Sequence, residues 1–215
     1  NRFYSFACVG VAPQDLKYKG EPTRCEIGAR TQVREHCTIH RGTVTGSGIT
    51  SVGDDCLLMA VVHVAHDCAL GNGVVVAHNV VMGGHVVIGD NAVIGGAAAI
   101  HQFVRIGRAA MIGGVSGVEG DVIPFGSVIG NRARLAGLNV IGLRRRGYDK
   151  AQIRALRAAF RHLFHGPGVF AERLASLRQD APPNDLVAEM LAFIGAAGRR
   201  GLIRTAVHAD DEDEA

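Results

Sequence analysis

Residues 74–118 read VVVAHNVVMGGHVVIGDNAVIGGAAAIHQFVRIGRAAMIGGVSGV, with an aliphatic side chain at every sixth position. The series starts upstream of this segment and has twelve members without a miss: Val52, Leu58, Val64, Leu70, Val76, Met82, Ile88, Ile94, Ile100, Ile106, Ile112 and Val118. Neither the period of an α-helix nor that of a strand produces a lone period of six. We interpret the series as a structural repeat.

The repeat of six also has internal rules. Glycine follows the aliphatic residue seven times in the series, and the residue two positions before it is small or β-branched. This pattern is typical of a triangular coil of three short strands, in which the aliphatic side chain points inward and glycine eases the bend of the backbone at the corner. Three repeats make one coil of 18 residues, and successive coils stack about 4.8 Å apart. We therefore predict a parallel β-helix over residues 1–135, with excursion loops near 10–24 and 42–51.

After residue 135 the spacing of the apolar residues changes from the repeat of six to the period of a helix. Residues 148–165, 170–179 and 185–197 show the spacing of amphipathic helices, and Gly166-Pro167-Gly168 ends the first of them. We predict an α-helical domain over 136–208 that covers the open end of the prism. An acidic tail, expected to be disordered, follows at 209–215. Asn1 is not a natural start, so we expect further coils to precede it.

Composition and charge restrict the function. The chain has no run of 18 apolar residues, so no membrane span is expected, and its five cysteines lack a CxxC pair, which favours reduced thiols in the cytoplasm. The net charge is +3, and without the five acids of the tail the remaining 23 basic and 15 acidic residues leave +8. A basic body suits an acidic partner or a phosphorylated ligand. No basic stretch interleaved with aromatics indicates nucleic acid.

Histidines outside the core form the main candidate site. Winding at 18 residues per coil sets Gly84 over His66 and Gln102 over Gly84. We expect four histidines to converge there: His63, His66, His85 and His101. Asp67 beside His66 is either the carboxylate that orients a basic imidazole or a corner aspartate that binds local amides.

Two further clusters stand outside the repeat. Gly96 stacks under Gly114, with Gly84 expected nearby, and the missing side chains open a groove along the prism that suits an acyl chain, unless they only serve turn geometry. Residues 144–146 are three arginines before a glycine, which form either a solvated run or a phosphate clamp.

Three classes of function are compatible with this pattern. Histidines shared between coils hold zinc in the β-helical carbonic anhydrases, and they also serve metal-free acyl transfer. An inert scaffold would explain the prism but not the histidines. Acyl transfer needs one base, an oxyanion donor, an acyl groove and a nucleotide clamp, and the residues offer this second set.

Several segments resemble a known family: EPTRCEIGARTQVREHCTIHRGT, LLMAVVHVAHDCALGN, GGHVVIG, GGVSGV and NVIGLRRRG. They are similar to UDP-N-acetylglucosamine O-acyltransferases, the first enzymes of lipid A biosynthesis, from about residue 3 to residue 204. The resemblance implies a left-handed parallel β-helix, a cytoplasmic homotrimer with active sites between subunits, and a 3-hydroxyacyl group donated by the phosphopantetheine thioester of acyl carrier protein. It implies neither metal nor cofactor.

The resemblance also assigns roles. It implies that His66 is the general base for the sugar 3-hydroxyl, that Asp67 orients it, and that the Gly84 N–H stabilises the oxyanion. Substrate contacts are implied for Asp15 and Lys17 from the neighbouring subunit, for His63, His85 and Gln102, and, at the nucleotide, for Asn139, Arg145 and Arg146. The acyl groove would involve Gly96, Gly114 and Arg132.

The nearest alternative is the UDP-3-O-acylglucosamine N-acyltransferase of the same pathway. It shares the prism and an equivalent histidine but adds an N-terminal uridine-binding domain. The His-Val-Ala-His-Asp sequence and the Asn-x-x-Gly-Leu-Arg-Arg-Arg-Gly sequence favour the O-acyltransferase.

Overall fold

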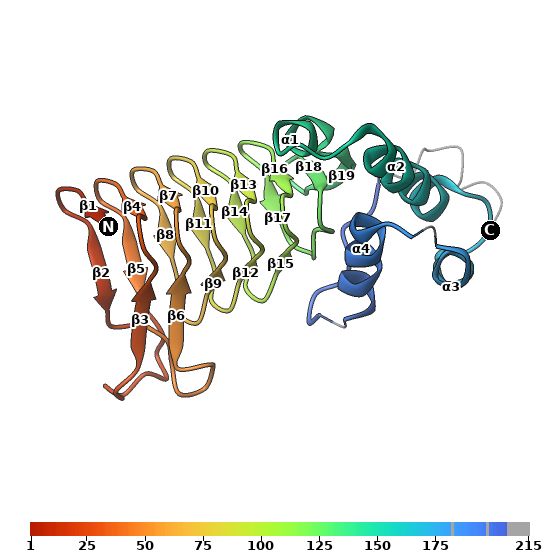
Figure 1. The fold of residues 1–215 in the computed structure, drawn as a ribbon. Coiled ribbons are helices and arrows are strands. Elements are labelled where there is room, and N and C mark those ends of the chain that lie inside the picture. The colour runs from red at the N-terminus through yellow and green to blue at the C-terminus, as the bar shows by residue number, and fades with distance from the viewer. Residues whose placement is uncertain (182, 197, 206–215) are drawn as a thin grey trace.

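The twelve spaced aliphatic residues line the inside of a triangular prism. In the computed structural model, which describes residues 1–181, 183–196 and 198–205, each of them is at most 4% exposed. Cross-coil pairing steps by 18 residues, since Val76 pairs with Ile94 and Ile94 with Ile112. The coils therefore stack in one register, as the repeat predicted, and the stacked strands run from red to green in Figure 1.

Three sheets form the faces of the prism. The first contains β1 (Arg2–Phe3), β4 (Gln32–Val33), β7 (Leu57–Leu58), β10 (Val75–Val76), β13 (Val93–Ile94), β16 (Met111–Ile112), β18 (Gly126–Ile129) and β19 (Arg134–Leu138). The second contains β2 (Cys8–Val11), β5 (Thr38–His40), β8 (His63–Val64), β11 (Val81–Met82), β14 (Ala99–Ile100) and β17 (Gly117–Val118). The third contains β3 (Arg24–Ile27), β6 (Ile49–Val52), β9 (Ala69–Leu70), β12 (Val87–Ile88) and β15 (Arg105–Ile106).

Glycine serves the corners for a different reason from the one expected. The left-handed corner positions are mostly occupied by other residues, such as Asp67 at φ +59° and His85 at φ +62°. The glycines after the aliphatic residues do not have positive φ, but a Cβ on Gly89 would lie 2.6 Å from the backbone nitrogen of Arg108 in the next coil. Glycine is needed there because neighbouring coils approach closely.

Two segments leave the coil. Residues 12–23 run between β2 and β3, and residues 41–48 run between β5 and β6. Both project from the same end of the prism, at the lower left of Figure 1. They can therefore approach the same coils, and the second of them contacts the site described below.

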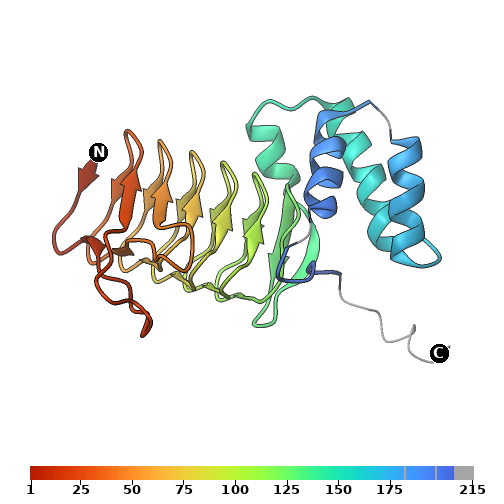
Figure 2. The ribbon, with the colours of Figure 1, turned by 90° about the horizontal axis from the view of Figure 1, so that it is seen from below.

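The prism ends in an antiparallel pair of β18 with β19, followed by helices. These are α1 (Val140–Arg145), α2 (Lys150–His165), α3 (Phe170–Asp180) and α4 (Asp185–Gly195). After α4 the chain returns to the last coil, where Asp121 bridges Leu202 (Figure 2). In the described ranges no helix is long and apolar enough to cross a membrane. The predicted acidic tail lies outside the described residues.

Candidate active site

His66 and Asp67 lie at the corner that follows β8. The Nδ1 of His66 lies 2.8 Å from Oδ2 of Asp67, and the two side chains are 18% and 1% exposed. An ionised carboxylate only accepts, so Nδ1 carries the proton that it donates, and Nε2 is left as the basic nitrogen. The pair has the arrangement of a base held by an orienting carboxylate.

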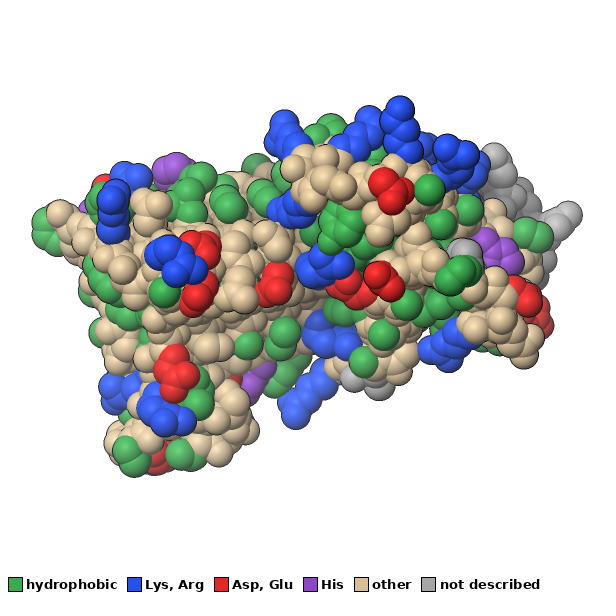
Figure 3. Space-filling view, viewed as in Figure 1, with side chains coloured by type: hydrophobic (Ala, Val, Ile, Leu, Met, Phe, Trp, Pro, Cys, Tyr) green, Lys and Arg blue, Asp and Glu red, His purple; other side chains and the backbone are tan. Residues whose placement is uncertain are grey.

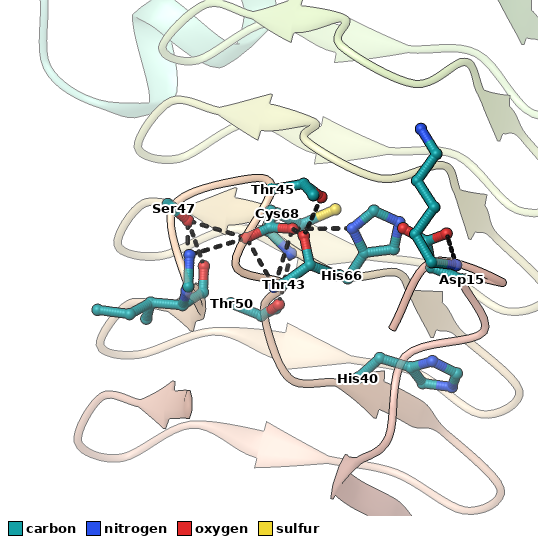
Figure 4. A network of polar contacts seen from close by, with 12 residues as sticks. Asp15, His40, Thr43, Thr45, Ser47, Thr50, His66 and Cys68 are labelled. Atoms are coloured by element: carbon teal, nitrogen blue, oxygen red, sulfur yellow. Dashed lines mark hydrogen bonds and ion pairs between the residues drawn. The ribbon is translucent and has the colours of Figure 1, made fainter. Parts of the chain in front are cut away.

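The excursion loop 41–48 supplies donors to the carboxylate of Asp67, and two of its residues, Thr43 and Ser47, are labelled beside His66 in Figure 4. The Thr43 hydroxyl donates to it at 2.6 Å, the Thr43 N–H at 3.1 Å, the Ser47 hydroxyl at 3.2 Å and the Gly48 N–H at 3.1 Å. Gly46 closes over it, where an added Cβ would fall 2.5 Å from Oδ2. The loop therefore forms a cage of donors around one buried anion.

This cage sets the charge state of Asp67. Burial alone would raise the pKa of the Asp67 carboxyl, but hydrogen bonds from Thr43 and His66 outweigh burial and hold the pKa below its ordinary value. The carboxylate is thus ionised at neutral pH and keeps the imidazole in one orientation. Asp67 therefore has both of the roles considered for it: it orients the imidazole of His66, and it accepts hydrogen bonds from local backbone amides.

Gly84 lies over the ring of His66, as the 18-residue winding predicted. A Cβ on Gly84 would fall 2.6 Å from Cε1 and 2.8 Å from Nε2 of His66. Within the described part of the chain, no group accepts a hydrogen bond from the Gly84 N–H. Gly84, whose backbone N–H is free, thus lies beside the basic nitrogen of His66.

A cleft of about 960 Å³ opens in front of this pair. Its lining residues are Gln14, Asp15, Leu16, Lys17, Thr45, Gly46, Ser47, His66, His85, Gln102, Phe103 and Arg199. The ring of His85 meets His66 edge-on at 5.1 Å and stacks on Phe103 at 4.5 Å. Asp15 and Lys17 line this cleft in the same chain as His66, and their predicted contact with the sugar of a neighbouring subunit stays a prediction.

The four histidines do not all converge. His66 and His85 share the cleft, but His63 bonds the Thr38 hydroxyl at 2.7 Å and packs against the buried His40. His101 is turned aside, where Arg200 donates to its Nδ1 at 2.7 Å. The winding brought all four to one edge, but side-chain direction separates them.

The other predicted groups lie on other corners of the prism. Gly96 and Gly114 stack as expected, since a Cβ added to Gly114 would lie 3.3 Å from the Gly96 carbonyl oxygen, but they stack at a different corner from Gly84. Asn139 caps α1 and donates to the Ala109 carbonyl at 3.0 Å, and Arg146 donates to the Asn91 carbonyl at 2.7 Å, which places both at the third corner.

Arg145 is exposed on the same short helix, α1, and Arg132 lies beyond the last coil, beside the returning segment 202–205. One chain thus holds the base, the glycine groove and the arginines on three separate edges.

His66, Asp67 and His85 offer ligand atoms within 4.8 Å of one another, which raises the question of a metal. Both oxygens of Asp67 already accept hydrogen bonds from the loop and from His66. The donor set fits an oriented base better than a zinc centre, because a carboxylate has about four lone-pair sites and those of Asp67 are already taken by these donors.

Sequence reasoning missed the cage residues Thr43 and Ser47, and it missed Phe103 and Arg199. The only signal for the first two was the cluster of hydroxyl residues in an excursion that adjoins the coil of His66. The place of Arg199 depends on the return of the chain from the helices, which no spacing indicates.

Comparison with known proteins gives the family. A curated acyl-[acyl-carrier-protein]--UDP-N-acetylglucosamine O-acyltransferase of Azorhizobium caulinodans is 54% identical over 199 residues, which are 93% of this chain and 73% of the relative. The chain belongs to the UDP-N-acetylglucosamine O-acyltransferase family. Family models agree, with UDP N-acetylglucosamine O-acyltransferase domain 2 over residues 121–203 and the bacterial transferase hexapeptide over 49–84.

Solved structures of O-acyltransferases share the architecture. The enzyme of Moraxella catarrhalis is 43% identical with a TM-score of 0.91, over 95% of this chain and 79% of the other. The UDP-N-acetylglucosamine acyltransferase of Campylobacter jejuni is 40% identical with a TM-score of 0.86, over 95% and 78%. The prediction of a left-handed parallel β-helix with a small helical C-terminal domain is confirmed, as is the O-acyltransferase family over its N-acyltransferase alternative.

Proposed function

We propose that this chain transfers a 3-hydroxyacyl group from acyl carrier protein to the 3-hydroxyl of UDP-N-acetylglucosamine, the first step of lipid A biosynthesis. The observation that carries the mechanism is the His66–Asp67 pair beneath the free N–H of Gly84. Family membership supplies the reaction class, and the geometry of this pair supports the roles that we propose.

The reaction begins at Nε2 of His66, which takes the proton of the sugar 3-hydroxyl as that oxygen attacks the thioester carbonyl. The new carbon–oxygen bond leaves a negative charge on the carbonyl oxygen, and the Gly84 N–H donates to it. The carbon–sulfur bond then breaks, and the departing phosphopantetheine sulfur receives the proton held by His66. General-base catalysis of this kind contributes about 10²- to 10⁴-fold. Base and donor both come from the chain, so the proposed mechanism uses no metal and no cofactor.

The substrate contacts follow from the cleft. We assign Asp15, Lys17, His85 and Gln102 to the acceptor and the donor arm, because they line the space in front of His66. His63 lies just outside this lining, held by Thr38, and we assign it to positioning at the edge of the acceptor site.

We further propose a homotrimer, because one chain does not bring its functional edges together. In an assembly of copies packed side by side, the cleft of one chain would face another edge of the next chain. That edge is either the one with Asn139, Arg145 and Arg146 or the one with the Gly96–Gly114 groove and Arg132. Exposed valines on and beside the second sheet support such contacts: Val61 is 49%, Val81 47% and Val115 73% exposed. Light scattering should give three times the chain mass of 22.6 kDa.

The helical domain suits an acidic carrier protein. Lys and Arg side chains gather over α1 and α2 in Figure 3, and a concave surface there is lined by Arg144, Lys150, Arg154, Arg157 and Arg161 among others. Acyl carrier protein is the acidic partner that we assign to this surface. The described cysteines are all free, and we place the reaction in the reducing cytoplasm.

An acyl-transfer assay tests the proposal. UDP-N-acetylglucosamine is incubated with 3-hydroxyacyl carrier proteins of graded length and with wild-type protein, His66→Ala or the control His165→Ala, an exposed histidine of α2. We expect His66→Ala alone to lose activity by about 10²-fold or more. Retained activity would remove His66 as the base, and stoichiometric zinc by elemental analysis would favour the carbonic anhydrase interpretation.

A further inference from the structure

The chain returns from the helices to the prism through residues 198–203. This segment is fixed to the last coil, since the Asp121 N–H donates to the Gly201 carbonyl and the Ile203 N–H donates to the Asp121 carbonyl, both at 2.9 Å. Arg200 donates to the Gln102 carbonyl at 3.1 Å as well as to His101. The chain that follows Arg199 is therefore held against the prism, and Arg200 contacts Gln102 at the edge of the cleft.

Arg199 lies at the open side of that cleft. Its guanidinium carbon is 4.4 Å from the centroid of the Phe103 ring, which stacks on His85. His85 in turn meets His66 edge-on, so a continuous column of rings connects Arg199 with the proposed base. Stacking on an aromatic face fixes the plane of a guanidinium and leaves its N–H groups at the edge for a ligand.

The charge of Arg199 is not neutralised within the described ranges, where it forms no ion pair. Lys17 is the other cation of the cleft, and its acidic lining residue is Asp15, whose Oδ1 accepts from the Lys17 N–H at 2.9 Å. Both substrates of the proposed reaction carry phosphate, as the diphosphate of the nucleotide sugar and as the phosphodiester of phosphopantetheine. A planar cation that lines the same cleft as the base is suited to either group.

We propose that Arg199 binds a substrate phosphate in the cleft of His66, as a specificity-determining residue for the reaction proposed above. The inference rests on that function. It adds to the site a residue from the segment 198–203, by which the chain returns from the helices to the prism. The guanidinium offers a phosphate two parallel N–H donors, whereas lysine in its place would offer only a point charge.

Two binding arms identify the source of the phosphate. In the first, calorimetry measures UDP and uridine binding to wild-type protein, Arg199→Gln and Arg199→Lys. In the second, the KM is measured for an acyl-phosphopantetheine and for the acyl-pantetheine that lacks phosphate. Loss of a charged hydrogen bond predicts that Arg199→Gln weakens the phosphate-bearing ligand of one arm by about 10- to 100-fold and leaves its phosphate-free counterpart unchanged. Arg199→Lys should fall between.

The matched control is Arg24→Gln, which removes an exposed arginine from β3, away from the cleft. Thermal unfolding confirms that each variant is folded. Equal constants within twofold for wild type and Arg199→Gln in both arms would overturn the inference, as would an equal loss for the ligands with and without phosphate. Failure of the wild type to transfer the acyl group would instead overturn the proposed function, and the UDP arm would still test Arg199.

Discussion

The ring of His66 occupies the place that a side chain on Gly84 would need. An added Cβ at Gly84 would lie 2.6 Å from Cε1 of His66, well inside van der Waals contact. We predict that Gly84→Ala displaces the imidazole and lowers kcat by about 10²-fold, because small misplacements of a catalytic group have effects of this size. The control is Gly201→Ala, where nothing lies within 4 Å of the added carbon. Full activity in Gly84→Ala would contradict the placement of the base.

The donor cage predicts a pH-dependent effect of Thr43→Val. The pKa of Asp67 lies below its ordinary value, so the cage stabilises the fold above pH 3.8 and this stability is lost as pH falls through the folded pKa. Removing the Thr43 hydroxyl should reduce the free energy of unfolding by about 1.5–3 kcal/mol at pH 7.

At pH 3 the difference between wild type and Thr43→Val should shrink. Urea unfolding at both pH values measures it, with Thr43→Ser as the variant that keeps the hydroxyl. A difference that is the same at pH 7 and pH 3 would show that Thr43 acts through packing instead.

One buried and two half-buried histidines predict a loss of stability in mild acid. Burial lowers the pKa of His40, of His63 and of His85, so the folded chain keeps them neutral when the unfolded chain begins to bind protons near pH 6.5. The Tm should therefore fall between pH 7 and pH 5.5. His40→Asn should flatten this fall, because its amide oxygen can still accept from the Gln14 N–H that now bonds Nδ1 of His40. An unchanged slope would assign the effect to other groups.

The base and the arginines lie on separate edges of one chain. We therefore predict that two variants, each lacking one of these groups, complement each other when they assemble together. His66→Ala and Arg145→Ala chains should each be weakly active alone. Mixed at equal amounts in a cyclic assembly, they should recover about a quarter of wild-type activity, since a quarter of the interfaces would pair two intact partners. A co-expression and assay experiment measures this, and no recovery would mean that each site is complete within one chain.

The period of six predicted the features that depend on register, and it failed where the chain leaves that register. It set Gly84 over His66 and Gly96 under Gly114 correctly because cross-strand pairing keeps every coil in phase. It could not show that Thr43 and Ser47 close on Asp67, since an excursion loop follows no repeat. It also gave the wrong reason for the corner glycines, because the close approach of neighbouring coils depends on distances between segments.

Because the coils stack in a single register, the length of the prism can change only in whole units of the repeat. Deleting one block of six residues between His66 and Gly84 would keep every aliphatic side chain facing inward, yet it would rotate all later residues by one edge. His66 would then face a residue from another edge in place of Gly84, and a folded but inactive protein would result. Only insertions or deletions of a whole coil of 18 residues keep the catalytic residues of neighbouring coils in register. We therefore infer that β-helical enzymes of this kind lengthen or shorten by whole coils near the site.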